Sequence, residues 1–200
     1  WRQAAIREEE LKRAHLALQY QSLKAQLRPH FLFNSLSSLV TLIGRDQEKA
    51  TQFVHRLSDV YRYVLEQTEN ELVSVDEELK FLEDYVFLQK IRYGKNIQVR
   101  MNLDLKDHRL VIPLSLQMMV ENAIKHNVVS ADHPLTVNIR SDDQSRIVIR
   151  NNIHRKEDVE GSPGLGLKNL RKRISVFSDD PLLVEETPES FTVTIPTIQT

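Results

Sequence analysis

The chain has 200 residues, of which 40% are hydrophobic and 28% charged, and its net charge is −1. This composition is typical of a globular protein with a real core, and the near-neutral charge argues against nucleic-acid binding. The absence of cysteine excludes disulfides and cysteine metal sites and suits a reducing compartment. No apolar run reaches the roughly 18 residues of a membrane span, and no signal peptide is present. Because the sequence opens inside a charged helical pattern, we expect a piece of a longer protein.

The first third of the sequence carries only helical spacing. One stripe recurs at steps of three and four and predicts a helix face: Leu16, Tyr20, Leu23, Leu27, His30 and Asn34. A second stripe recurs at steps of seven and predicts a bundle seam: Leu11, Leu18, Ala25, Leu32 and Leu39. The stretch from Gly44 to Gln47 breaks the pattern, which resumes from Phe53 to Val64. The result is an antiparallel helical hairpin, and its small core favours a homodimer that forms a four-helix bundle.

The remainder of the chain changes period. A polar joint at residues 66–75 precedes a helix from Asp76 to Tyr93, and two more helices are predicted at Leu114–Asn127 and Gly166–Phe177. Apolar residues alternate with polar ones in four predicted strands: Ile97, Val99, Met101 and Leu103; Leu135, Val137 and Ile139; Ile147 and Ile149; Phe191, Val193 and Ile195. The fold class is therefore α+β, a helical hairpin (1–70) followed by an α/β sandwich with one sheet covered on one face (71–200).

The first chemical motif is the hexapeptide from Pro29 to Asn34, PHFLFN, within the first predicted helix. A proline inside a helix costs about 3 kcal/mol and kinks it, which would expose the ring of His30. Neutral imidazole is a competent nucleophile near pH 7, and Asn34 lies one turn later, where its amide can orient a water or a phosphoryl oxygen. The alternative is an ordinary helix histidine beside a tolerated proline.

The second motif is ENAIKHN, at the end of an amphipathic helix with Leu116, Met119, Val120 and Ala123 on its apolar side. The amide oxygen of Asn122 is a hard ligand that suits Mg²⁺, which takes one or two protein ligands together with phosphates and waters. Glu121 can accept a hydrogen bond from a metal-bound water or assist proton removal. The alternative is a solvated helix end.

The third motif is a cluster of glycines, Gly161, Gly164 and Gly166, just before a predicted helix that carries Lys168, Arg171 and Arg173. Glycine permits close backbone approach, and the free amides of a helix N-terminus suit phosphate. A polar loop of about residues 152–163 precedes the site and is predicted to be a lid. The alternative is a plain turn.

In this order, the three motifs resemble the sensor histidine kinases of the autolysin-regulator type, whose acceptor box is PHFLFN-like, from about residue 20 to the end. The second half resembles the Bergerat-fold ATPases, which include gyrase, MutL and a heat-shock chaperone. The resemblance implies that His30 is phosphorylated and that Asn34 stands where other histidine kinases have a residue implicated in dephosphorylation. It also implies that Glu121 and Asn122 belong to the box that holds Mg²⁺-ATP, with Asn122 as the metal ligand.

The same resemblance assigns the nucleotide-binding residues. Lys125 and His126 would line the site, and Gly164, Gly166, Leu167 and Lys168 would form the glycine box. There are two departures. Asn151 stands where many relatives have an aspartate that binds the adenine amino group, and an amide oxygen accepts that bond without the charge that strengthens it. Phe31, and not an acidic residue, follows the histidine, so the base is expected to be Glu121.

The function that the resemblance implies is ATP- and Mg²⁺-dependent autophosphorylation of His30, followed by transfer to an aspartate of a response regulator. The expected setting is a homodimeric cytoplasmic domain of an inner-membrane protein, controlled by an upstream sensor outside this chain. One alternative is a catalytically weak, kinase-like dimeric scaffold, which the asparagine at position 151 favours. An ATP-driven clamp is a further alternative, but a clamp needs no PHFLFN hairpin.

Overall fold

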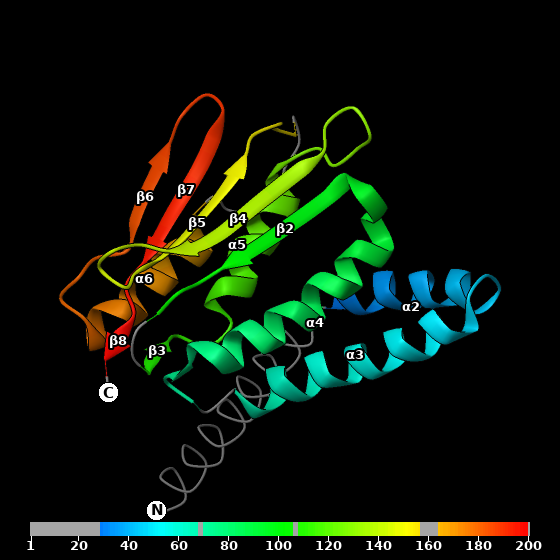
Figure 1. Cartoon of the computed structure of the whole chain (residues 1–200), viewed down its shortest axis with the longest axis horizontal. Coiled ribbons are helices and arrows are strands. Elements are labelled where there is room, and N and C mark those ends of the chain that lie inside the picture. Colours follow the sequence, from blue (N-terminus) through cyan, green and yellow to red (C-terminus); the bar gives the residue numbers. More distant parts are fainter. Residues whose placement is uncertain (1–28, 68–69, 106–107, 157–163, 200) are drawn as a thin grey trace, which may run out of the picture. The chain divides into compact units, whose positions relative to one another are not determined.

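The computed structural model describes residues 29–67, 70–105, 108–156 and 164–199 of the chain (Figure 1). The chain divides into two compact units, Trp1–Val54 and His55–Thr200. The predicted domain boundary at residue 70 lies after the second helix and stays a prediction. The parts of the predicted helical stripes before Pro29 lie outside the described residues. The predicted kink at Pro29 lies at their edge, because the residues that precede the proline are not described. No described helix is both long and apolar enough to span a membrane.

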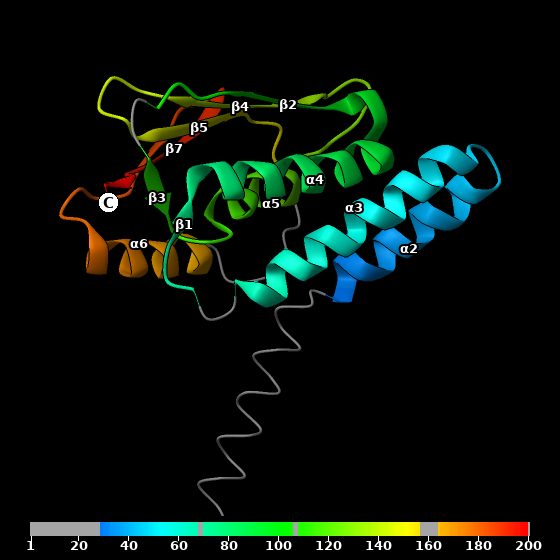
Figure 2. The same ribbon diagram turned by 60° about the horizontal axis from the view of Figure 1, so that its bottom comes forward.

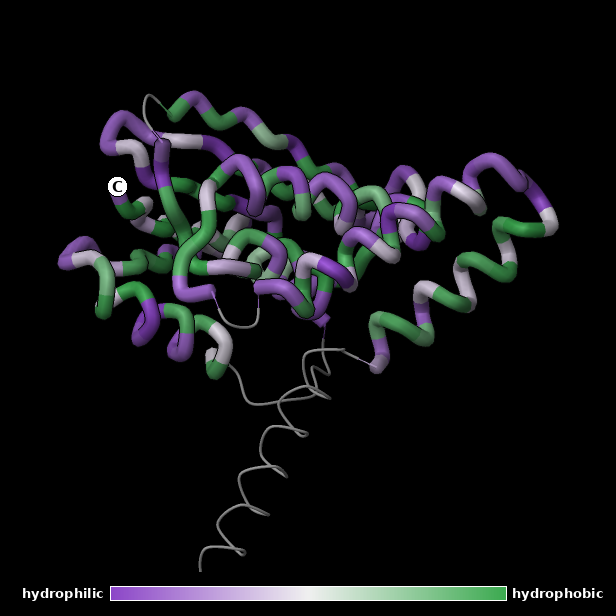
Figure 3. The backbone as a smooth tube through the Cα atoms, turned by 90° about the horizontal axis from the view of Figure 1, so that it is seen from below, coloured by the Kyte–Doolittle hydropathy of each residue, from purple (hydrophilic) through white to green (hydrophobic). Residues whose placement is uncertain are grey.

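The predicted hairpin is confirmed in its described part. Helix α2 spans Pro29–Ile43 and helix α3 spans Gln47–Glu66, with the break at the predicted place. Asp46 caps the second helix, because its carboxylate accepts the backbone N–H of Lys49 at 3.0 Å. Although α2 is largely hydrophobic (Figure 3), Ser35 is its one buried residue among those described.

The second unit is built on a five-stranded sheet of order β2-β4-β5-β7-β6, in which only the β2–β4 pair is parallel. The strands are β2 Ile97–Asn102, β4 Leu135–Ser141, β5 Ile147–Asn152, β6 Leu183–Glu186 and β7 Ser190–Ile195. The predicted alternation is confirmed in β4, where Leu135, Val137 and Ile139 are buried, whereas in β5 Val148 is buried as well as Ile147 and Ile149. The predicted Leu103 lies just beyond the end of β2.

Three helices cover one face of this sheet: α4 Val75–Tyr93, α5 Ser115–His126 and α6 Leu165–Phe177 (Figure 2). Each end of these three helices lies within one residue of its predicted position. The predicted apolar side of α5 is confirmed, because Leu116, Met119, Val120 and Ala123 are all buried. Burial of this apolar surface against the sheet is the main driving force for the fold.

The prediction of a single sheet is wrong. A second, antiparallel sheet of order β1-β3-β8 consists of Val73–Ser74, Arg109–Val111 and Ile198–Gln199. These strands have two or three residues, too few to show a period of two. The edge strand β6 was also missed, because all four of its residues are exposed and do not alternate.

A buried carboxylate joins the helices of the second unit. Glu78, in the first turns of α4, is 0% exposed. Its Oε2 accepts the hydroxyl of Tyr63 on α3 at 2.8 Å and the N–H of Leu114 at 3.0 Å, and its Oε1 accepts the N–H of Leu116 at 3.0 Å. The two backbone donors belong to the N-terminus of α5, where helix N–H groups lack internal partners. Leu114 has a φ of 64°, a costly conformation for leucine that this contact helps to hold.

Replacing Glu78 with Gln should destabilise the protein by about 1–3 kcal/mol, because an amide NH₂ group accepts no hydrogen bond and leaves buried donors unpaired. Burial raises the pKa of Glu78 above the ordinary value of about 4.5, against its hydrogen bonds, which lower it. The stability that protonated Glu78 contributes is therefore complete below about pH 4.5 and is lost as the pH rises toward the folded-state pKa.

Urea unfolding of the wild type and of Glu78→Gln from pH 4 to 8 tests this, with Glu83→Gln on the exposed side of α4 as control. The stability difference should be largest at low pH and narrow as the pH rises. A loss no larger than that of the control, or a difference that widens with pH, contradicts the prediction.

Candidate functional site

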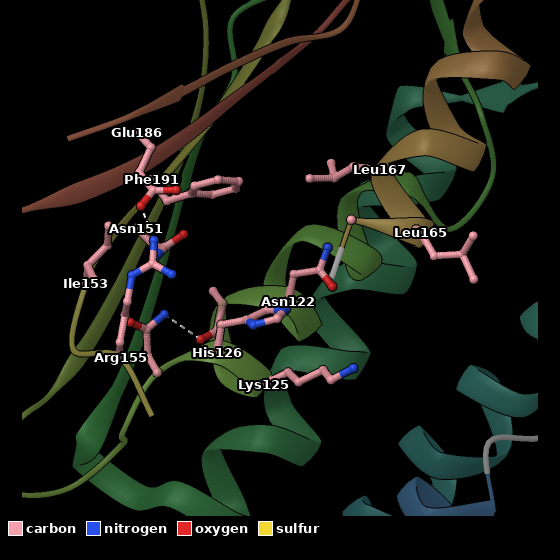
Figure 4. Close-up of a pocket in the computed structure, with 14 residues that line it drawn as sticks. Asn122, Lys125, His126, Asn151, Ile153, Arg155, Leu165, Leu167, Glu186 and Phe191 are labelled. Carbon is pink, nitrogen blue, oxygen red and sulfur yellow. Dashed lines mark hydrogen bonds and ion pairs between the residues drawn. The ribbon is translucent and has the colours of Figure 1, made fainter. Parts of the chain in front are cut away.

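A cavity of about 340 Å³ opens between α5, the N-terminal end of α6 and the sheet (Figure 4). It brings together seven of the residues that the sequence singled out, although their motifs are far apart in the chain: Asn122, Lys125, His126, Asn151, Gly164, Gly166 and Leu167. All of them belong to the second unit.

The last turn and a half of α5 forms one wall of the cavity. Asn122, Lys125 and His126 lie on it because positions three and four apart share a helix face. Burial lowers the pKa of His126, and the positive charges of Lys125, Arg155 and Lys156 lower it further. The wall thus offers a neutral imidazole beside several cations, which favours an anionic ligand.

A row of three residues across neighbouring strands forms the opposite wall. Asn151 on β5 pairs in register with Phe191 on β7, which pairs with Glu186 on β6, so the three side chains share one face of the sheet. Figure 4 shows the Phe191 ring directed into the cavity. Asn151 is buried, and its Nδ2 donates to the carbonyl of Asn152 at 2.7 Å. With the amide nitrogen engaged, Oδ1 is the group that can accept from a ligand.

The segment from Ile153 to Lys156 ties the two walls together. Asn127 is the main link, because its Oδ1 accepts the N–H of His154 at 2.7 Å and its Nδ2 donates to the carbonyl of Ala123 at 2.8 Å. The ammonium of Lys156 donates to the carbonyls of Ile124 at 3.0 Å and Lys125 at 3.3 Å, which caps the C-terminus of α5.

The same segment adds a charge pair to the cavity. Arg155 forms an ion pair with Glu186, and both line the cavity (Figure 4). Sequence reasoning gave no place in the site to Ile153, Arg155, Glu186 and Phe191, and it named Asn127 only as a polar group of the second motif. Asn127 ends the predicted motif and could have been proposed as a helix C-terminal residue, whereas the other contacts depend on strand register.

The start of α6 closes the third side. Gly164 has a φ of 82°, in the left-handed region that favours glycine, and it precedes the first helical residue. A side chain at Gly166 would meet the sulfur of Met118 on α5 at 3.2 Å, so glycine lets α5 and α6 approach closely. Leu165 and Leu167 both line the cavity (Figure 4), and the side chain of Leu165 is largely exposed.

Two predicted residues of the second unit do not line the cavity. Glu121 lies on α5, where its Oε2 accepts Nε2 of Gln117 at 2.9 Å. Lys168 is exposed on the first turn of α6, and its N–H donates to the carbonyl of Gly164. The predicted lid is described only as far as Lys156, and Gly161 lies outside the described residues.

His30 and Asn34 belong to the first unit and are described by themselves. The amide nitrogen of Asn34 lies 3.2 Å from Nδ1 and 3.1 Å from Nε2 of His30. The prediction that both side chains share one helix face is therefore confirmed. His30 is exposed.

The cavity has the donors and acceptors of a nucleotide–metal site. The Asn122 amide oxygen, the Lys125 ammonium and the free amides at the start of α6 suit phosphates and a magnesium ion, while Asn151 and Phe191 suit a base. In the described part of the chain, no three His, Asp or Glu side chains cluster as a metal site. Mg²⁺ in nucleotide sites takes one or two protein ligands together with phosphates and waters.

Comparison with known proteins finds similarity to histidine kinases. Residues 18–97 match the histidine kinase family model. The chain is 37% identical over 124 residues to the sensor protein LytS of Staphylococcus saprophyticus, covering 62% of this chain and 20% of LytS. It is 32% identical over 176 residues to the sensor histidine kinase BtsS of Escherichia coli K12, covering 85% of this chain and 31% of BtsS. The chain thus spans a fifth to a third of these relatives.

Among solved structures, the nucleotide-free catalytic domain of histidine kinase ThkA aligns with a TM-score of 0.44 and 21% identity, covering 62% of this chain and 94% of ThkA's. The match to the family model and the two sequence relatives connect this chain with sensor histidine kinases, including the LytS type.

Proposed function

We propose that the chain is the kinase core of a two-component sensor: it binds Mg²⁺-ATP in the cavity, phosphorylates His30 and passes the phosphoryl group to an aspartate of a response regulator. The observation that carries the proposal is the cavity itself. It opposes groups that suit phosphates (Lys125, Asn122 and the start of α6) to a wall where the buried Asn151 and the half-buried Phe191 suit a base. The match to histidine kinases makes ATP the expected nucleotide.

The arrangement of the walls orients the nucleotide. The phosphates lie toward the amides that follow Gly164, where the helix dipole and Lys125 neutralise their charge. The base lies against Asn151, whose Oδ1 accepts the exocyclic amino group of adenine, and Phe191 contacts the ring. His126, kept neutral by its low pKa, borders the nucleotide without adding a proton. Asn122 would hold Mg²⁺ through its amide oxygen, and the ion would screen the phosphate charge.

The transfer uses the imidazole of His30 as the nucleophile. The lone pair of a ring nitrogen forms a bond to the γ-phosphorus while the bond from that phosphorus to the β–γ bridging oxygen breaks, and ADP leaves. The proton on the other ring nitrogen is lost to a base, for which Glu121 is the sequence-based candidate. Asn34, in contact with both ring nitrogens, can orient the ring and later a water that removes the phosphoryl group.

The hairpin suits a dimeric assembly. Four exposed apolar side chains of α2 recur at helical spacing on one stripe, and their exposed fractions range from 45% to 72%: Phe33, Leu36, Val40 and Ile43. A second copy of the hairpin would bury this stripe in a four-helix bundle. An upstream sensor would then act through the hairpin, which agrees with the names of the relatives as sensor proteins. The place that we propose is the cytoplasmic side of an inner membrane.

A kinase-like dimeric scaffold with weak catalysis is the second candidate, and the neutral Asn151 favours it. A carboxylate in that position would bind the adenine amino group through a charge-assisted bond, whereas an amide binds it more weakly. Nucleotide affinity separates the candidates, because a scaffold needs none.

The His30→Gln variant should lose all incorporation of label from γ-labelled ATP and Mg²⁺, since glutamine provides no nucleophilic nitrogen. Wild type and His55→Gln, an exposed histidine on α3, should both acquire acid-labile label. Label that survives in His30→Gln contradicts the assignment of the acceptor. Absence of label from the wild type together with absence of ATP binding supports the scaffold.

The Asn122→Ala variant should bind Mg²⁺-ATP about tenfold more weakly, equivalent to ~1.4 kcal/mol, because it removes the amide oxygen that contacts the metal. Titration calorimetry with and without Mg²⁺ measures the effect, and Asn138→Ala, an exposed asparagine on β4, is the matched control. If the two variants lose equal affinity, or if the loss persists without Mg²⁺, Asn122 is not the metal ligand.

The Asn151→Asp variant should bind ATP about threefold to tenfold more tightly, because charge-assisted hydrogen bonds are roughly twice as strong as neutral ones. Inosine triphosphate has no 6-amino group, so its affinity should not rise. The substitution also removes the contact with the Asn152 carbonyl, so thermal stability is measured alongside. An equal gain for both nucleotides, or no gain for ATP in a folded variant, contradicts the role of Asn151 in binding the base.

A further inference from the structure

Glu78 on α4 contacts two other helices, α3 and α5, and α5 ends at the cavity. Its carboxylate accepts from Tyr63 on α3 and from the N-terminal amides of α5. Its charge also acts on Arg173 of α6: burial lowers the pKa of that guanidinium, and the charges of Glu71 and Glu78 oppose the shift. The cavity is lined by the C-terminal end of α5 and the N-terminal end of α6. A single side chain thus connects α3 with α5, which forms one wall of the cavity.

Helix α5 can transmit a displacement from one end to the other. It has 12 residues, so it is about 18 Å long, and its backbone hydrogen bonds make it move as a unit. Its start is fixed by Glu78 through Leu114 and Leu116, while its last turns carry Asn122, Lys125 and His126. A change in how Glu78 holds the first turn therefore alters the place of the ligand-facing side chains.

Tyr63 is the contact through which α3 reaches this carboxylate. Its ring stacks on Phe81 of α4 with centroids 4.3 Å apart and an interplanar angle of 15°, which aims the hydroxyl at Glu78. Burial and the charge of Glu78 raise the pKa of Tyr63 far above its ordinary value, so the hydroxyl remains a donor. Without it, the buried carboxylate has fewer donors to hold its position.

Helix α3 has a second attachment to α4 that bypasses Glu78. Arg56 forms an ion pair with Asp84, and its guanidinium lies 5.4 Å from the centroid of the Phe87 ring. This contact joins the same two helices without involving the N-terminus of α5. A variant of Arg56 therefore weakens the attachment of α3 to α4 without affecting Glu78, whereas a variant of Tyr63 removes the contact of α3 with Glu78 and so with α5.

We propose that Tyr63 is a positioning residue for the nucleotide cavity: its hydroxyl, acting through Glu78, holds α5 in the arrangement that binds the ligand. The proposal rests on the proposed function, because it takes the ligand to be Mg²⁺-ATP. Helix α3 belongs to the hairpin whose other helix carries His30, so a movement of α3 becomes a change in nucleotide affinity. By linkage, nucleotide binding stabilises the Tyr63–Glu78 contact to the same extent.

The test is the affinity for Mg²⁺-ATP of Tyr63→Phe, which keeps the ring stack and removes only the hydroxyl. The dissociation constant, measured well below the melting temperature, should rise by about fivefold or more, the lower end of usual coupling between sites. Hydrogen exchange at the amides of Leu114 and Leu116 should be faster in the variant. In the wild type, Mg²⁺-ATP should slow exchange at the same amides.

Two controls separate positioning from general stability. Tyr93→Phe removes a phenol hydroxyl from the end of α4, and Arg56→Gln loosens the second α3–α4 attachment; both should keep the wild-type affinity. In a Glu78→Gln background, Tyr63→Phe should have no additional effect on affinity. If Glu78→Gln does not fold, the test rests on hydrogen exchange at the amides of Leu114 and Leu116 in Tyr63→Phe alone.

The outcomes distinguish the two proposals. A wild type that does not bind Mg²⁺-ATP overturns the proposed function, and the positioning role falls with it. A wild type that binds, with a Tyr63→Phe variant that melts earlier but keeps its affinity within about twofold and its exchange rates at Leu114 and Leu116, overturns only the positioning role. An equal loss of affinity in Arg56→Gln also overturns it, because the effect then follows any loosening of α3.

Discussion

The buried carboxylate of Glu78 is the constraint on which the arrangement of the second unit depends. A charge-bearing group with no exposed surface needs hydrogen-bond donors, and the nearest unused ones are the N-terminal amides of a helix. Meeting that need fixes where α5 begins and holds Leu114 in a left-handed conformation that leucine rarely adopts. Because the start of α5 is fixed, its C-terminal turn has one place relative to the sheet, and the cavity forms there.

The cavity is kept open by polar ties between its walls. Two close-packed walls of apolar residues would collapse onto each other, but the link through Asn127 and Lys156 sets a distance between the end of α5 and the end of β5. Gly166 instead shortens a distance, because the absence of a side chain allows α6 to approach Met118 on α5 closely. The cavity is therefore defined by hydrogen bonds on one side and by the absence of a side chain on the other.

The sequence predicts most of the elements and many residues of the site, since periodicity and motif chemistry are local properties. The bounds of α4, α5 and α6 follow from spacing, and Asn122, Lys125, Asn151 and Gly164 do gather at one cavity. What the sequence does not reveal is pairing between distant segments. Phe191 and Glu186 become neighbours of Asn151 only through strand register, and β6 has no alternation that would have indicated it as a strand.

The charge balance of the cavity follows from the same register. Glu186 is the one acid among the described residues that line it, and the ion pair with Arg155 engages it. Lys125 and the amides at the start of α6 then border the cavity without a compensating carboxylate at position 151. Binding free energy in such a site comes mainly from the phosphates and less from the base. Under the proposed function, such a cavity would hold the nucleotide by its charged end, which is the end that the proposed phosphoryl transfer to His30 would use.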